Sequence, residues 1–81
     1  MPMKYVVMDI GGAEVPMLFP ENVQHSDFAC WIKQSVPASK PVSAGFVRQG
    51  ADGLVAYGKS LSLNISSRES DTALVKQCLE H

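Results

Sequence analysis

The segment Lys4–Ile10 (KYVVMDI) constrains the fold of this chain most, because its β-branched and aromatic residues predict a strand that is apolar on both faces. Successive side chains of a strand point to opposite faces, so Tyr5 and Val7 lie opposite the stripe formed by the even-numbered apolar residues. A Gly-Gly pair follows and supplies the positive φ angles of a two-residue turn, which predicts that Ala13–Phe19 returns as the second strand of a hairpin. A strand with two apolar faces is covered twice or belongs to an interface, so the cover over Tyr5 and Val7 decides the architecture.

The rest of the chain repeats this order of two strands and a helix. The second strand contains Pro16, which cannot donate to a ladder, so that strand is expected at a sheet edge or bulge. Ser26 is the expected N-cap of the first helix. Two further strands are expected at residues 41–49 and 54–65, the latter with a bend or bulge at Gly58. Phe28, Trp31 and Ile32 are expected to form the apolar face of the first helix. Val42, Ala44 and Phe46 are expected to share one face of the third strand.

The C-terminal part predicts a second helix. Ser66 followed by Glu69 matches a capping box, and an apolar stripe at helical spacing follows it. The order β-β-α-β-β-α predicts an α+β fold in one small domain, residues 1–81, with a four-stranded antiparallel sheet and two helices packed on one face. The last residues, 79–81 (LEH), resemble the opening of an expression tag and are either native or derived from a tag.

The charge balance and the hydropathy pattern exclude several classes of protein. The 7 Lys and Arg against 8 Asp and Glu give a formal net charge of −1, which provides no strong field toward nucleic acid or an anionic membrane. No apolar run approaches the ~18 residues of a membrane-spanning helix, and the first residues lack the regions of a signal peptide. A cytoplasmic protein is therefore expected. In that reducing compartment, Cys30 and Cys78 are expected to be core thiols on helix faces, with a disulfide or a reactive thiol as the alternative.

Three local patterns suggest chemistry, and each has a simpler explanation. Residues 7–13 (VMDIGGA) resemble the phosphate loop of the sugar kinases of the actin-like ATPase family, but Ala13 replaces the hydroxyl residue and a hairpin turn explains the pattern. His25-Ser26-Asp27 contains the letters of a hydrolase triad, yet sequence neighbours point in different directions, so a surface histidine before a capped helix is expected. Residues 66–70 form either an anion site that uses Arg68 or a plain helix cap. No catalytic, cofactor-binding or metal-ligating residue is predicted, and the chain is not expected to be an enzyme.

Two surfaces remain as candidate binding sites. Tyr5, Val7 and Leu18, with several methionines near them in sequence, form an apolar patch suited to a protein partner or a second copy, unless helices or termini cover it. Arg48 and Lys59 come together across the second hairpin as a small basic patch. The leading expectation is a non-catalytic interaction module that acts through protein–protein contacts and forms a homodimer. The alternative is a nucleic-acid-binding accessory protein that uses the basic patch.

Several segments spread over nearly the full chain form one recognisable pattern. They are residues 4–10 (KYVVMDI), Phe19-Pro20, His25-Ser26, residues 42–47 (VSAGFV), residues 57–63 (YGKSLSL) and Ser67-Arg68. Together they resemble small phage- and prophage-encoded proteins of uncharacterised function. The resemblance implies a bacterial cytoplasmic setting and an accessory role in phage biology, and it assigns no activity to any residue.

Overall fold

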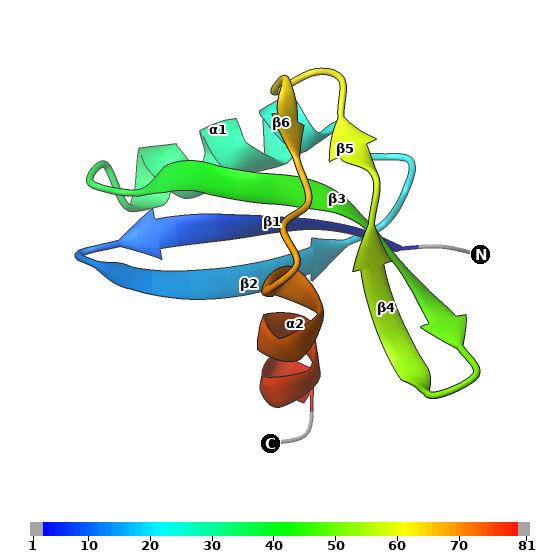
Figure 1. Ribbon diagram of the computed structural model, residues 1–81. Coiled ribbons are helices and arrows are strands. Elements are labelled where there is room, and N and C mark those ends of the chain that lie inside the picture. Colours follow the sequence, from blue (N-terminus) through cyan, green and yellow to red (C-terminus); the bar gives the residue numbers. More distant parts are fainter. Residues whose placement is uncertain (1–2, 80–81) are drawn as a thin grey trace.

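The first hairpin forms as the sequence predicts. The computed structural model describes residues 3–79, in which β1 (Met3–Ile10) and β2 (Ala13–Phe19) pair in antiparallel fashion from Lys4 opposite Phe19 to Ile10 opposite Ala13. Gly11 and Gly12 have φ angles of 62° and 90°, so the turn uses the backbone freedom that only glycine has. The remaining elements are α1 (His25–Ser35), β3 (Lys40–Gly50), β4 (Gly53–Tyr57), β5 (Lys59–Ser60), β6 (Ile65–Ser66) and α2 (Asp71–Leu79) (Figure 1).

The main sheet has four antiparallel strands in the order β2-β1-β3-β4. This confirms the predicted α+β class, the four-stranded antiparallel sheet and the two helices. The doubly apolar strand β1 is internal, and β2 with Pro16 lies at an edge, where a missing backbone N–H leaves no ladder bond unmade. Neither helix within residues 3–79 is long and apolar enough to cross a membrane.

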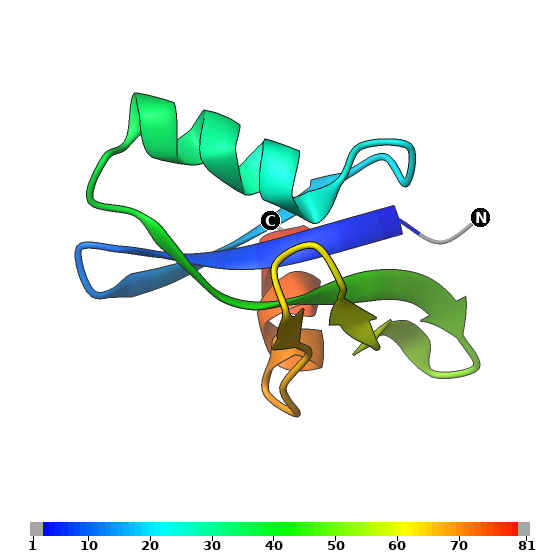
Figure 2. The same cartoon turned by 90° about the horizontal axis from the view of Figure 1, so that it is seen from above.

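The two helices cover opposite faces of the sheet, which corrects the prediction that both pack on one face (Figure 2). Val6 and Met8 of β1 pack in one cluster with residues of α1. Tyr5 and Val7 pack in a second cluster with Val75 of α2. Because the side chains of β1 alternate between the faces, a strand that is apolar throughout needs a cover on each side, and the two helices supply one each.

A β-bulge in β3 changes which of its side chains share a face. The register between β1 and β3 shifts between Val7 and Met8, where Ser43 is followed by Pro41 as the next partner. Val42 therefore packs with the α2 cluster, whereas Ala44 is buried in the α1 cluster. The prediction that Val42, Ala44 and Phe46 share one face is wrong for Val42, because an extra residue in one strand reverses the alternation.

The strand predicted at 54–65 is divided into three pieces. β4 ends at Tyr57, Gly58 turns the chain with a φ angle of 80°, and β5 and β6 then form a small two-stranded sheet of their own. The residues between β5 and β6 make a turn that contains Asn64 with a φ angle of 56°. The predicted bend at Gly58 is present, but the chain beyond it folds back on itself instead of continuing the strand (Figure 1).

Both helix starts differ from the predicted caps. α1 begins at His25, and the N-cap residue Gln24 makes no side-chain hydrogen bond to the helix. The backbone N–H of Ser26 instead donates to Ser62 Oγ at 3.1 Å, so a residue 36 positions away caps this helix. At α2, the Asp71 carboxylate accepts a hydrogen bond from the backbone N–H of Arg68 at 3.0 Å, in place of the predicted box of Ser66 and Glu69.

Candidate binding groove

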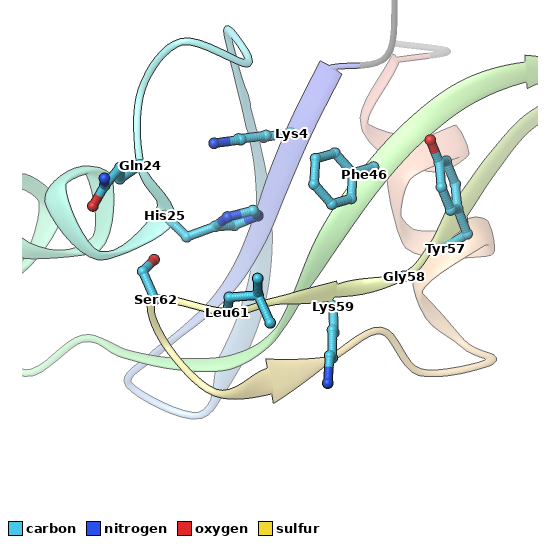
Figure 3. A pocket seen from close by; sticks show the side chains of 9 residues that line it. All are labelled: Lys4, Gln24, His25, Phe46, Tyr57, Gly58, Lys59, Leu61 and Ser62. Atoms are coloured by element: carbon cyan, nitrogen blue, oxygen red, sulfur yellow. The ribbon is translucent and has the colours of Figure 1, made fainter.

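An open groove of about 670 Å³ lies on the α1 side of the molecule, where the start of α1, the bend after β4 and the β5–β6 turn meet. Figure 3 shows the side chains that line it, which come from segments far apart in the sequence. They are Lys4, Gln24, His25, Phe46, Tyr57, Gly58, Lys59, Leu61 and Ser62. We call this site the β4–β5 groove.

Aromatic residues of two neighbouring strands form one wall of the β4–β5 groove. Phe46 of β3 lies opposite Tyr57 of β4, and their ring centroids are 5.9 Å apart at an angle of 32°. The guanidinium of Arg48 lies 5.6 Å from the centroid of the Tyr57 ring, within cation–π range. Gly58 has Phe46 directly beside it, so a larger residue at the bend would displace this ring. The wall therefore depends on the glycine at the end of β4.

His25 forms the inner part of the groove and is 3% exposed, which corrects the prediction of a surface histidine. Its Nε2 lies 2.9 Å from the carbonyl oxygen of Gly45, so the N–H on that nitrogen donates to the backbone. The ring meets Phe19 and Phe46 edge to face, with centroid distances of 5.2 and 5.8 Å. Burial, followed by the positive charge of Lys4, lowers the pKa of His25 below its usual value. The imidazole is therefore neutral at pH 7 and acts as a packing residue.

Leu61 stands at the rim of the groove with 83% of its surface exposed. The turn that carries it is fixed on both sides. Ser60 Oγ accepts a hydrogen bond from the backbone N–H of Leu63 at 3.1 Å, and Ser62 Oγ accepts the one from Ser26. The side chain of Leu63 packs against the α1 cluster. Leu61 is thus held in solvent by a turn that is anchored to the core and to α1.

The charged groups at the groove are positive. Lys4 and Lys59 line it, and Arg48 lies beside it over Tyr57. Lys4 Nζ donates to the carbonyl oxygen of Val23 at 2.9 Å, whereas Lys59 is an exposed residue of β5. None of the residues that line the groove is acidic, within the part of the chain that the structure describes. The groove therefore combines apolar walls with a local excess of positive charge on a protein of net charge −1.

The structure places both members of the basic patch suggested by the sequence near the groove, with Arg48 over the Tyr57 ring and Lys59 in the lining. Arg48 pairs with Val55 in the β3–β4 ladder, and Lys59 follows the bend at Gly58. Phe46, Leu61 and the buried His25 were not among the sequence-based site residues. The sequence contains one signal for the groove, the run Tyr57-Gly58-Lys59. A glycine directly after an aromatic strand residue indicates a bend, and the residues after the bend can then pack beside the aromatic ring.

The apolar patch suggested by the sequence is not a surface. Tyr5 and Val7 are fully buried beneath α2, and Leu18 is a half-buried neighbour of the same cluster. The Tyr5 hydroxyl donates to Asp71 Oδ2 at 2.6 Å, which ties the strand to the first turn of α2. This corrects the assignment of Tyr5 and Val7 to an interface, because the second helix covers the face that the sequence left open.

The groups proposed for anion binding satisfy one another. Arg68 donates to both carboxylate oxygens of Glu14 at 2.9 and 3.1 Å and, through Nε, to Asp71 Oδ1 at 3.1 Å. In the hairpin turn, Asp9 Oδ1 accepts a hydrogen bond from the backbone N–H of Gly12 at 3.0 Å. The capping and turn explanations of these patterns therefore account for their polar groups, and the guanidinium of Arg68 is already engaged by two carboxylates.

The cysteines are exposed, which corrects their placement in the core. Cys30 lies on the outer side of α1 and Cys78 near the end of α2, and neither is in a disulfide within residues 3–79. No group of three or more His, Cys, Asp or Glu residues in the described range could hold a metal ion. Of the residues that resemble an expression tag, 80 and 81 lie outside the described range.

The chain stands apart in comparisons with known proteins: no family model, no curated protein and no solved structure matches it.

Proposed function

We propose that this protein is a non-catalytic interaction module that binds a protein partner in the β4–β5 groove. The observation that carries the proposal is the exposure of Leu61, 83%, on a turn whose neighbours are fixed to the core and to α1. A large apolar side chain held in water costs hydration free energy, and burying it in a complex recovers about 1.5–3 kcal/mol.

The composition of the groove supports a protein partner. Tyr and Arg are the residue types that most often dominate binding energy at interfaces, and Tyr57 and Arg48 lie side by side here. The turn and the wall are already ordered by hydrogen bonds and aromatic packing, so little conformational entropy is lost when a partner binds. Because the sequence resembles phage and prophage proteins, we propose that the module is an accessory protein of phage biology and that its partner is found in bacterial cells.

The test is affinity capture from a bacterial lysate with three versions of the purified protein. The unchanged protein and the Leu79→Ala variant are expected to retain the same partner, because Leu79 is an exposed leucine of α2 on the other face. The Leu61→Ala variant is expected to lose it. Retention of every captured protein by Leu61→Ala would contradict the proposal. Light scattering of the same samples tests the expected homodimer, which the Leu61→Ala change should weaken if the partner is a second copy.

Nucleic-acid binding is the second candidate, and the contact of Arg48 with Tyr57, with Lys59 nearby, favours it. Aromatic rings and cations that follow a groove are the usual elements of single-strand binding. An electrophoretic mobility shift that weakens with Arg48→Ala and Lys59→Ala and with added salt would support this candidate. Absence of any shift at low salt would remove it.

A further inference from the structure

The charges around the β4–β5 groove identify the kind of partner that it fits, on the basis of the function proposed above. Arg48 lies over the Tyr57 ring, Lys59 lines the groove, and no residue lining the groove within residues 3–79 is acidic. Both ion pairs in the described range involve Arg68, which is far along the chain and bound to Glu14 and Asp71. The charges of Arg48 and Lys59 are therefore not neutralised by an ion pair within those residues.

The apolar part of the groove lies next to these cations, since Lys59 lines the groove and the Arg48 guanidinium lies over the Tyr57 ring. Phe46, Tyr57 and Leu61 line it, and Figure 3 shows the Leu61 side chain beside the ring of His25 and on the same side of the groove as Lys59. One apolar side chain can occupy this space while charged groups on either side of it reach Arg48 and Lys59. Opposite charges at the rim of an interface orient the partner and raise its association rate.

We propose that the β4–β5 groove binds an acidic peptide segment of a partner protein, in which one large apolar side chain is flanked by carboxylates. The apolar side chain packs against Phe46, Tyr57 and Leu61. The carboxylates accept hydrogen bonds from Arg48 and Lys59.

Two observations favour a peptide over a nucleic acid strand. Leu61, the most exposed large apolar residue at the groove, is aliphatic and offers no aromatic face for a base to stack on. Tight binding of a phosphate backbone also requires several cations along its path, whereas the groove presents Lys4, Arg48 and Lys59, and Lys4 is bonded to Val23.

The test is an NMR titration of the ¹⁵N-labelled protein with short synthetic peptides. The acidic probe is acetyl-Asp-Glu-Phe-Glu-Asp-amide, a second peptide replaces each acidic residue by lysine, and a third replaces the phenylalanine by glycine. The acidic probe is expected to shift the backbone amide signals of Gly58, Leu61 and Ser62. The lysine peptide and the glycine peptide are each expected to bind at least about tenfold more weakly than the acidic probe.

Variants link the binding to the named residues. Arg48→Gln combined with Lys59→Gln is expected to weaken the acidic probe about tenfold, whereas Lys76→Gln on α2 removes one positive charge away from the groove and leaves binding unchanged. Leu61→Ala is expected to weaken it similarly, and Leu79→Ala is the matched control. Correct folding of each variant is read from the dispersion of the same spectra.

The remaining outcomes overturn the inference in distinguishable ways. Equal binding of the acidic and lysine peptides refutes the charge preference while leaving the groove as an interaction site. Shifts with a ten-nucleotide thymidine strand but with none of the peptides assign the groove to nucleic acid. If no probe shifts any signal, the inference that the groove binds an acidic peptide is refuted. The proposed function is tested separately by affinity capture, and it fails when the Leu61→Ala variant retains every captured partner.

Discussion

At the level of single residues, Gly58 forms the bend that shapes the β4–β5 groove. Its backbone φ angle of 80° is one that residues other than glycine rarely adopt, and a Cβ atom added to it would lie 3.2 Å from Cδ2 of Phe46. We therefore expect Gly58→Ala to lower the free energy of unfolding by about 1–2 kcal/mol from backbone strain, with a further loss from the displaced ring. Urea denaturation measures the change.

Gly12→Ala is the matched control for that prediction. Gly12 also has a positive φ angle, 90°, but no atom lies within 4 Å of its added Cβ. The control therefore contains the strain without the contact, and Gly58→Ala should be the more destabilising of the two. Equal losses would show that Phe46 is not held against the bend.

The buried His25 predicts a dependence of stability on pH. Burial and the charge of Lys4 lower its folded-state pKa below the unfolded value of about 6.5, so below that pH the unfolded chain binds a proton that the folded chain does not. The contribution of neutral His25 to the free energy of unfolding is therefore complete above pH 6.5. It is lost as the pH falls from 6.5 through the folded-state pKa, so the protein becomes less stable in acid. Urea denaturation at pH 7.5 and 5.5 measures this, and His25→Gln should reduce the difference. An unchanged difference in that variant would contradict the assignment.

At the level of elements, the attachment of α2 depends on a buried polar contact. The Tyr5 hydroxyl donates to Asp71 at 2.6 Å, and both side chains are fully buried. Burial tends to raise the pKa of Asp71, but hydrogen bonds from Tyr5 and the Arg68 backbone outweigh it, so the pKa is lowered and the group is a carboxylate at pH 7. Burial, together with the hydrogen bond to the same carboxylate and its negative charge, raises the pKa of Tyr5. The pair is therefore one charged acceptor and one neutral donor.

Removal of this donor is expected to destabilise the protein. Tyr5→Phe keeps the ring but removes a hydrogen bond to a charged group, so the free energy of unfolding should fall by about 1.5–3 kcal/mol. Tyr57→Phe, which removes a hydroxyl at the half-exposed groove wall, should change it by less than about 0.5 kcal/mol. Urea denaturation of both variants is the measurement. A Tyr5→Phe loss no larger than the Tyr57→Phe loss would show that the contact does not hold α2.

The elements that follow from local rules could be predicted, and those that depend on distant contacts could not. The Gly-Gly hairpin, the edge position of the strand with Pro16 and the bend at Gly58 follow from backbone preferences. The cap of α1 could not be found locally, because its acceptor is Ser62. The alternation that suggested one long strand over residues 54–65 also fits a turn with Leu61 outside and Leu63 inside.

The candidate site was predicted in part for the same reason. Arg48 and Lys59 could be assigned to one patch because Arg48 lies in the second hairpin and Lys59 follows directly after it. Their relation to His25 and Leu61 depends on how α1 and the β5–β6 turn pack, and that packing is a long-range property. A sequence rule also assigns histidine to the surface, whereas a backbone carbonyl from Gly45 makes burial of His25 tolerable.

At the level of the whole molecule, both apolar faces of β1 are covered, so the two clusters share one strand. Val6 and Met8 belong to the α1 cluster, and Tyr5 and Val7 to the α2 cluster. A chain of 81 residues buries a limited core, and neither cluster is large. Loss of one cluster removes half of the support of β1, so we expect the two sides to unfold together.

This cooperativity can be measured because the chain contains one tryptophan, Trp31, which lies on α1. Val75→Ala on α2 removes buried apolar surface from the opposite cluster and should lower the free energy of unfolding by about 2 kcal/mol. If β1 couples the two sides, the Trp31 fluorescence transition and the far-UV circular dichroism transition in urea will shift together and remain coincident. A fluorescence transition that stays in place while part of the dichroism is lost earlier would show that α2 detaches alone. In that event the groove on the α1 side could bind its partner without α2, whereas coincident transitions mean that each contact of α2, the Tyr5–Asp71 pair included, also maintains the groove.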